Sequence, residues 1–316
     1  MLRRDLYNCK IIFNLILLVA LFFSIPSFAF EKSSTLNLDS TDVSWKKLLF
    51  KAEEFFVELT AEVELTSSPS SEINNSLIST SKGTPFTIKG SETLVIDTRI
   101  LIESILGDLR LRKAAWFNPV DLSTLQYLRQ RTGLKDSNKI YRFTNEGVFR
   151  LAKHPIDKSE ALKLPEEWSQ SNEKFYPYEQ EVDSCSSVTA PIPLIYLVST
   201  LKSSDFIKPV TVCVFNKKET VYLDIQYDSA ESVQLDHVEL KEDKILHRNT
   251  LVLADVLSLK ARSILSGMAI EGFTLLGLQG NIRIYIDRES RIPVQLEGSY
   301  KGLGQIKLNL HKVVHH

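Results

Sequence analysis

The chain has 316 residues, of which 43% are hydrophobic, and its formal net charge at pH 7 is −1. The hydrophobic fraction is sufficient for a large core, and the length allows one large β domain or two small ones. Because the chain is so close to neutral, its overall charge does not attract nucleic acid or an anionic membrane, and we expect no nucleic-acid partner.

Residues 1–29 have the features of a secretory signal peptide. Three basic side chains precede an apolar run over residues 11–25, and residues 27–29 fit the small-x-small cleavage rule, so we expect cleavage after Ala29. The alternative is an uncleaved anchor in the inner membrane, although about 15 apolar residues are short for a span of about 20. No second long apolar run follows, so the cleaved chain should have no transmembrane anchor.

The remaining sequence predicts a flexible segment over residues 30–43 and a single β-rich domain over residues 44–316. The domain is expected to begin with a short amphipathic helix over residues 45–54, since Trp45, Leu48 and Ala52 share a helical face. Alternation of apolar and polar residues then predicts a strand over residues 57–65. A Ser- and Pro-rich loop over residues 66–81 should follow.

Two long strands are predicted next, over residues 94–106 and 109–116, joined by the Gly107-Asp108 turn. A helix over residues 99–106 is the alternative, because short apolar runs are ambiguous. Asp121 is expected to begin a helix that continues to residue 131.

The middle of the chain combines regular and irregular segments. Residues 139–151 are typical of a hairpin, whereas residues 155–188 read as a long irregular loop with one helical turn near residues 159–162. The apolar segment 191–201 predicts a helix that is covered on several sides.

The last part of the chain is predicted to be mostly strands. Strands are expected over residues 210–215, 220–227, 231–240 and 272–278, with a bulge near Asp236. Residues 251–264 are ambiguous between helix and strand, and we predict a helix. Residues 280–313 alternate strictly and predict a three-stranded antiparallel meander.

Two cysteines remain after removal of the signal peptide, Cys185 and Cys213. An even number of cysteines in an exported protein predicts a disulfide, which would close a loop of about 28 residues. Two independent thiols are the alternative, with Cys213 buried on its strand.

Part of the sequence resembles known families. The segment IDRESRIPVQLEG, with Arg291-Ile292-Pro293-Val294 and a helix about 90 residues earlier, is similar to a family of exported Gram-negative bacterial proteins of unknown function that carry an R-[IL]-P-V strand near their end. The stretch LLFKAEEFFVELTAEVEL resembles the start of periplasmic lipoprotein-carrier half-barrels. These resemblances imply an open curved antiparallel sheet or half-barrel with two or three packed helices, in a mainly β (α+β) fold.

The sequence contains none of the common catalytic or metal-binding motifs. The sequence has no Gly-x-Ser-x-Gly elbow, His-Glu-x-x-His motif or P-loop. A metal site among the C-terminal histidines is not expected, because no Cys, Asp or Glu shares their spacing. Asp97, Glu103 and Asp224 are candidates for acid–base chemistry, but polar strand faces carry such residues routinely. We predict no catalytic residue, metal or cofactor, and an enzyme is the less favoured interpretation.

Aromatic residues are concentrated in the middle third of the chain. A concave sheet lined with aromatic side chains holds apolar ligands in many proteins, whereas ordinary core packing is the alternative. The candidates for a ligand or partner surface are Trp168, Tyr176, Tyr178, Tyr141 and Phe143.

The function that these features favour is a non-enzymatic periplasmic protein of the cell envelope. We expect it to bind a lipid or another amphipathic envelope component between sheet and helix, since burial of an acyl chain supplies about 0.8 kcal/mol per methylene. Two alternatives are a scaffold that binds another envelope protein and a hydrolase of glycans or lipids.

Overall fold

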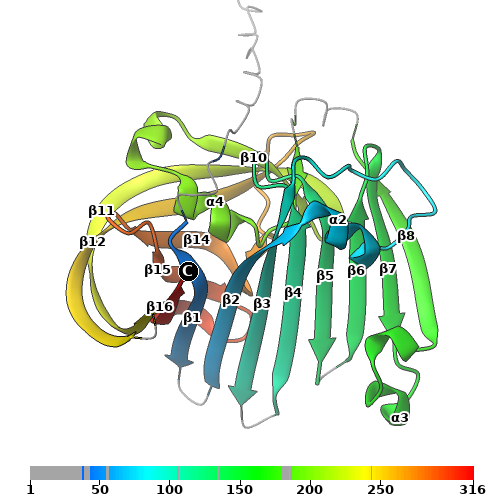
Figure 1. Cartoon of the computed structure of the whole chain (residues 1–316), viewed down its shortest axis with the longest axis horizontal. Helices are drawn as coiled ribbons and strands as arrows, with labels where there is room; N and C mark the ends of the chain where they lie inside the picture. The colour runs from blue at the N-terminus through cyan, green and yellow to red at the C-terminus, as the bar shows by residue number, and fades with distance from the viewer. Residues whose placement is uncertain are drawn as a thin grey trace, which may run out of the picture. The chain divides into compact units, whose positions relative to one another are not determined.

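One continuous sheet contains all sixteen strands that the structure describes (Figure 1). The computed structural model describes residues 38, 43–54, 57–104, 107–133, 135–179, 185, 187–242 and 244–316, all of which lie in the unit Ser33–His316. The predicted signal peptide with its cleavage site at Ala29, and most of the segment 30–43, lie outside the described residues. No described helix is both long and apolar enough to cross a membrane.

The first half of the sheet is an antiparallel meander in which each strand pairs with the next along the chain. Its strands are β1 (Trp45–Glu54), β2 (Val57–Pro69), β3 (Glu92–Ser104), β4 (Leu109–Phe117), β5 (Thr124–Thr132), β6 (Ser137–Phe143), β7 (Gly147–His154) and β8 (Gln170–Pro177). Short helices occur only between strands in this half: α2 (Ser70–Ile73), η2 (Asn74–Ser76), α3 (Lys158–Ala161) and η3 (Pro165–Glu167).

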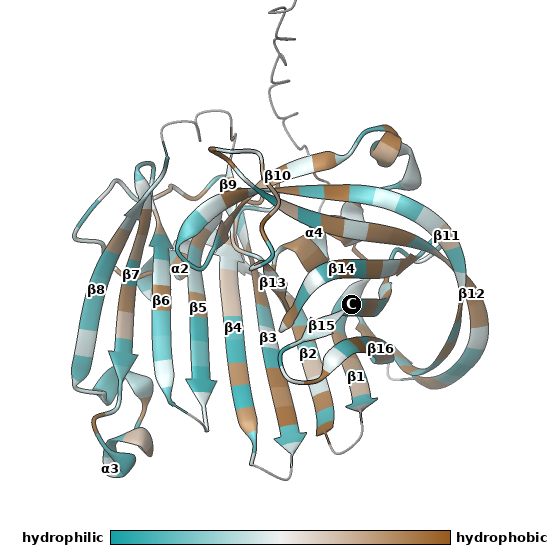
Figure 2. Cartoon of the chain, turned by 180° about the vertical axis from the view of Figure 1, so that it is seen from behind, coloured by the Kyte–Doolittle hydropathy of each residue, from teal (hydrophilic) through white to brown (hydrophobic). Residues whose placement is uncertain are grey.

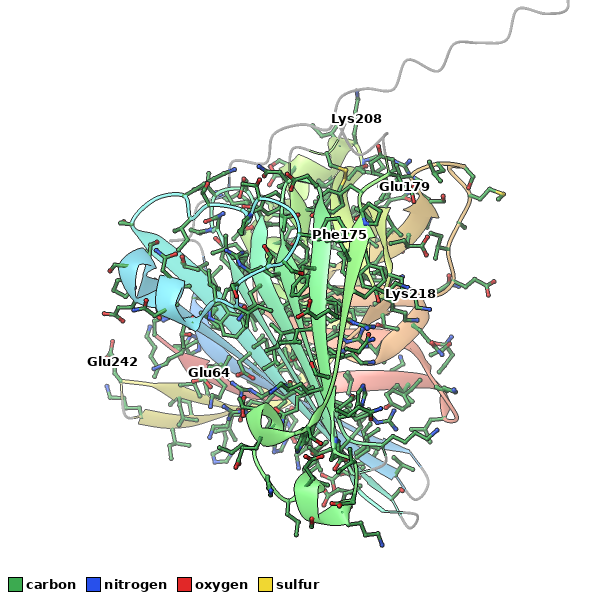
Figure 3. All side chains as sticks on the ribbon, turned by 90° about the vertical axis from the view of Figure 1, so that its right-hand side faces the viewer. Glu64, Phe175, Glu179, Lys208, Lys218 and Glu242 are labelled. Atoms are coloured by element: carbon green, nitrogen blue, oxygen red, sulfur yellow. A yellow bond between two sulfur atoms is a disulfide. The ribbon has the colours of Figure 1, made fainter. Side chains whose placement is uncertain are left out.

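The second half returns to the first through the C-terminal strand, which pairs with β1. It comprises β9 (Val188–Thr189), α4 (Leu194–Thr200), η5 (Ser203–Ile207), β10 (Val210–Asn216), β11 (Glu219–Lys241), β12 (Lys244–Ser263), β13 (Thr274–Leu275), β14 (Leu278–Asp287), β15 (Pro293–Tyr300) and β16 (Gly304–His315). The long β11–β12 hairpin curves around the C-terminal strands, and its tip at Glu242 projects from them (Figures 1 and 3).

The tip of this hairpin closes a ring of five strands. Val238, Glu239 and Leu240 of β11 pair in parallel with β16 at residues 312–314, beyond the point where β15 stops pairing with β16. Because β11 also pairs with β12, β12 with β14, and β14 with β15, the five strands enclose a common interior.

Helix α4 is the centre of the core. All seven of its residues are buried, and the indole Nε1 of Trp45 on β1 donates a hydrogen bond to Ser199 Oγ at 3.1 Å. The prediction of an apolar helix covered on several sides is confirmed, as is that of a β-rich fold built on a large curved antiparallel sheet. The closing meander and the hairpins around Gly107 and Gly147 are also confirmed.

Three predicted helices are strands, and each has a physical reason for its misleading pattern. The helix over 45–54 is wrong because a register shift between Trp45 and Lys47 puts Trp45 and Leu48 on one face of β1, which imitates a helical spacing. The helix over 121–131 is mostly β5, whose first four residues are buried on both faces. The helix over 251–264 is wrong for the same reason, because residues 254–259 of β12 are all buried.

Smaller differences concern loops and bulges. The irregular segment 155–188 contains the edge strand β8, and β2 continues into the predicted loop as far as Pro69. The register shift in β11 lies between Tyr227 and Ser229 rather than near Asp236. The predicted strand over 272–278 is reduced to the two residues of β13.

A buried carboxylate joins four elements of the second half. Asp255 on β12 is fully buried and accepts hydrogen bonds from Arg288 at 2.7 and 2.9 Å, Arg291 at 3.1 Å and Ser203 at 2.6 Å. Arg291 also donates to the carbonyl oxygens of Val198 and Leu201 at the C-terminal end of α4. Burial raises the pKa of Asp255, but these hydrogen bonds and the two positive charges outweigh it and lower the pKa overall.

We expect Arg291→Met to lower the free energy of unfolding by about 3 kcal/mol, because it removes one of the two arginines that pair with the buried carboxylate and the donor to the carbonyl oxygens at the end of α4. The matched control is Arg99→Met, which removes an exposed pair with Glu62 and should cost less than about 1 kcal/mol. Urea unfolding followed by circular dichroism measures both losses. Equal losses in the two variants would contradict a special role for Arg291.

The predicted disulfide between Cys185 and Cys213 is present, with Cα atoms 6.0 Å apart. A crosslink over 28 residues of sequence restricts the unfolded chain and typically contributes about 3–4 kcal/mol. We therefore expect the double variant Cys185→Ala, Cys213→Ala to unfold at lower urea concentration. Reductant should lower the midpoint of the wild-type protein and leave that of the double variant unchanged, and an equal response of both would be inconsistent with the bond.

Candidate functional site

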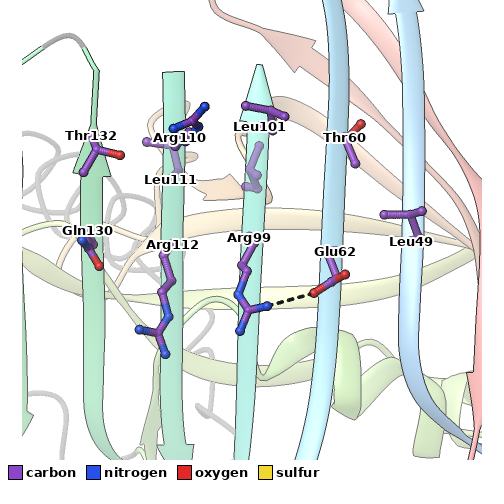
Figure 4. A pocket seen from close by; sticks show the side chains of 11 residues that line it. Leu49, Thr60, Glu62, Arg99, Leu101, Arg110, Leu111, Arg112, Gln130 and Thr132 are labelled. Carbon is purple, nitrogen blue, oxygen red and sulfur yellow. Dashed lines mark hydrogen bonds and ion pairs between the residues drawn. The ribbon is translucent and has the colours of Figure 1, made fainter. Parts of the chain in front are cut away.

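The outer face of the sheet has a shallow hollow of about 470 Å³ across β1 to β5 (Figure 4). Each of its charged side chains already takes part in an ion pair. Arg99 Nη1 lies 3.3 Å from Glu62 Oε1, and Arg112 Nη2 lies 2.7 Å from Asp97 Oδ2. This hollow therefore has no excess of charge that a ligand would neutralise.

A second cavity, of about 580 Å³, lies between the β11–β12 hairpin and the β14–β15 turn. His237 is buried there, with Nε2 at 3.1 Å from Glu239 Oε1, and Arg248 Nε donates to the other oxygen of Glu239 at 3.1 Å. Burial raises the pKa of Glu239, but the hydrogen bonds from Arg248 and His237 lower it overall. Nδ1 of His237 has no hydrogen-bond partner, whereas the carboxylate is fully paired.

A third cavity, of about 990 Å³, lies between the inner face of β3 to β7 and three turns of the second half. In Figure 2, β13 and the β15–β16 turn lie beside β3 and β4 on this face. We call this the basic cavity, because seven of its nineteen described lining residues are lysine or arginine and none is acidic: Lys113, Arg129, Arg131, Lys135, Lys139, Lys217 and Lys301.

Three of these cations are direct neighbours across adjacent strands. Lys113 on β4 is paired in register with Arg129 on β5, and Arg129 is paired with Lys139 on β6. Side chains in such positions have Cβ atoms about 5 Å apart, and like charges there are destabilising. The residues that continue the row, Thr98 on β3 and Ala152 on β7, are uncharged. We call Lys113, Arg129 and Lys139 the cationic row.

The cationic row has no acidic counterpart in the part of the chain that the structure describes. None of its members takes part in an ion pair there, although Arg129 forms a hydrogen bond with Tyr141. Lys113 is only 8% exposed, and its burial, together with repulsion from Arg129, lowers its pKa to about 7. Burial and the charges of neighbouring arginines lower the pKa of Lys139 as well.

The wall next to the cationic row is apolar. Ile102 is buried on β3, Leu109 and Leu111 follow on β4, and Tyr300 closes the cavity from the β15–β16 turn. Figure 2 shows the same division along the sheet, with mainly hydrophobic colours on β3 and mainly hydrophilic colours on β5 and β6. The basic cavity thus presents an apolar side and a strongly positive side to one occupant.

The aromatic candidates lie in or against the core rather than on an exposed surface. Tyr141, Phe143 and Tyr176 surround Phe215 of β10, with ring centroids 5.6–5.9 Å from it. Trp168 is 3% exposed, and Tyr178 is partly buried against the core. These positions correct the expectation of an aromatic surface, because the sheet curves until β10 covers the inner faces of β6 and β8.

The acidic candidates are not brought together. Asp97 and Glu103 are six residues apart on β3, which corresponds to about 20 Å. Asp224 lies on β11, where it accepts a 2.7 Å hydrogen bond from Arg262. The structure therefore offers no carboxylate pair among the three.

Reasoning from the sequence missed the basic cavity. Arg129 and Arg131 follow Tyr127 with a spacing of two, so a strand over these residues would have placed both on the core side of the sheet. The helix predicted over 121–131 concealed this signal.

No family model and no curated protein matches the chain. Among solved structures it is similar to the crystal structure of a beta-barrel-like protein of domain of unknown function DUF1849 from Brucella abortus. The TM-score is 0.48 and the sequence identity is 10%, and the match covers 87% of this chain and 98% of that chain.

Stability should depend on pH through Lys113. Its pKa is about 7 in the folded chain and about 10.5 when unfolded, so the unfolded state binds more protons between these values and stability rises with pH. We expect the free energy of unfolding to increase by up to about 1.4 kcal/mol per pH unit from pH 7.5 to 9.5, relative to Lys113→Met. Urea unfolding over this pH range tests the difference, and parallel profiles for the two proteins would rule it out.

Proposed function

We propose that this chain binds an amphipathic anion in the basic cavity and acts as a carrier or receptor for it rather than as an enzyme. The observation that supports the proposal is the cationic row, a set of adjacent positive charges without an acidic partner among the described residues. A negative group placed there would remove their mutual repulsion, so binding gains energy that is absent from a paired site.

The size and lining of the basic cavity support the same ligand class. Its volume of about 990 Å³ is at the upper end of the range common for small-molecule sites. An acyl or alkyl chain against Ile102, Leu111 and Tyr300 would add about 0.8 kcal/mol for each buried methylene. This position differs from the expected one between sheet and α4, because α4 is already enclosed by the core.

We further propose that this ligand is a component of the cell envelope and that the chain acts in the periplasm. The support is the signal-like segment 1–29 together with the disulfide, which is compatible with an oxidising compartment. In this setting a soluble sheet that shields an amphipathic molecule needs no catalytic group.

The double variant Arg129→Gln, Lys139→Gln tests the proposal in a titration with a fluorescent fatty acid. We expect saturable binding to the wild-type protein and at least tenfold weaker binding to the variant, because two of the three adjacent charges are lost. The matched control is Arg110→Gln on the outer face of β4, which should bind within twofold of the wild type.

Higher salt should weaken binding to the wild-type protein more than binding to the double variant, since charge attraction is screened. Absence of saturable binding to the wild type, or equal affinity in all three proteins, would overturn the proposal.

A further inference from the structure

The cationic row is arranged for more than one negative charge. Its three side chains come from consecutive strands and point to the same face of the sheet, so their charged ends converge on one volume. A monocarboxylate has one negative charge to set against three adjacent cations. A phosphate monoester has about 1.5–2 negative charges at pH 7 and three acceptor oxygens.

The donors present also fit phosphate. Arginine presents a planar set of N–H groups that matches phosphate oxygens, and lysine contributes a compact charge with three donors. Arg131 lies two residues along β5 from Arg129 and also lines the cavity, and its Nε is buried without a hydrogen-bond partner. An unpaired buried N–H of this kind is costly unless a ligand accepts from it.

The surroundings of Lys113 also favour a ligand that carries more than one negative charge. The Lys113 pKa of about 7 reflects burial and the repulsion by Arg129, so the Lys113 amine is only partly protonated at neutral pH. The titratable residues that line the cavity around it in the described part of the chain are Arg129, Arg131, Lys135, Lys139, His154, Lys217, Tyr300 and Lys301. None of them is a carboxylate, so no described lining group offsets the repulsion. A dianion bound beside Lys113 would raise the pKa of its amine and so favour the protonated, charged form.

From this geometry we infer that the anionic group of the ligand is a phosphate monoester, held by Lys113, Arg129 and Lys139, with its apolar chain on the side of Ile102 and Leu111. The inference rests on the proposed function and names the head group of its ligand. A phospholipid with a terminal phosphate and a soluble phosphate ester share this head group. Only the lipid has an apolar chain to bury against the apolar wall, so it should bind more tightly.

Isothermal titration calorimetry with three probes tests the head group: dodecyl phosphate, dodecanoate and inorganic phosphate, the first two below their micelle concentrations. We expect dodecyl phosphate to bind at least tenfold more tightly than dodecanoate, and inorganic phosphate to bind at least tenfold more weakly than dodecyl phosphate. Lys113→Met should reduce the preference for dodecyl phosphate over dodecanoate to less than threefold. Proton uptake on binding at pH 8, measured in two buffers of different ionisation enthalpy, should disappear in the same variant.

Each result has a defined meaning. Equal affinity for dodecyl phosphate and dodecanoate would overturn the phosphate head group and leave the proposed amphipathic ligand in place. If inorganic phosphate binds as tightly as dodecyl phosphate, the phosphate site stands and the apolar chain is excluded. Lack of binding by all three probes overturns both proposals. Arg110→Gln serves again as the control and should retain the wild-type preference.

Discussion

The Asp255 carboxylate constrains how the second half of this protein is assembled. A fully buried charge is tolerated only when its hydrogen bonds and counter-charges are supplied by the fold, and here Arg288, Arg291 and Ser203 supply them. Arg291 also donates hydrogen bonds to the last carbonyl oxygens of α4. Because α4 is buried, water cannot satisfy these groups. These bonds fix the turn before β15 and the end of α4 against strand β12. Because β12, β14 and β15 belong to the five-stranded ring, they also fix part of the ring.

The two faces of the sheet differ in how their charged side chains are paired. On the outer face, several cations pair with carboxylates of a neighbouring strand, as Lys47 on β1 does with Glu62 and Glu64 on β2, in positions that water reaches. On the inner face, strands β4 to β6 place three cations side by side without an acidic partner among the described residues. Proteins break local rules of this kind mainly where a ligand or reaction compensates for the cost, which is why the basic cavity is the site that needs a functional explanation.

The strands could be predicted from the sequence where one face of the sheet is exposed to solvent. Strict alternation correctly predicted the closing meander, and the Gly107-Asp108 turn between two apolar segments correctly predicted the β3–β4 hairpin. The pattern failed where strands are covered on both faces, as in residues 254–259, and where a bulge shifts the period, as at Trp45. The disulfide was predictable from the number of cysteines and the expected export. The cavity was not, because its lining comes from β3 to β7 and three distant turns, whose arrangement no local pattern in the sequence reveals.

The chemistry of the cavity is specified by register rather than by a motif. Lys113, Arg129 and Lys139 are separated by 16 and 10 positions along the chain, and only the pairing of β4 with β5 and of β5 with β6 makes them neighbours. A slip of one residue in β5 would move Arg129 to the outer face and bring the uncharged Leu128 or Gln130 between the two lysines. The register shift beside Trp116 and the hydrogen bond of Arg142 to Leu125 O resist such a slip. The proposed site therefore has no local sequence motif, because its three cations become neighbours only in the paired strands.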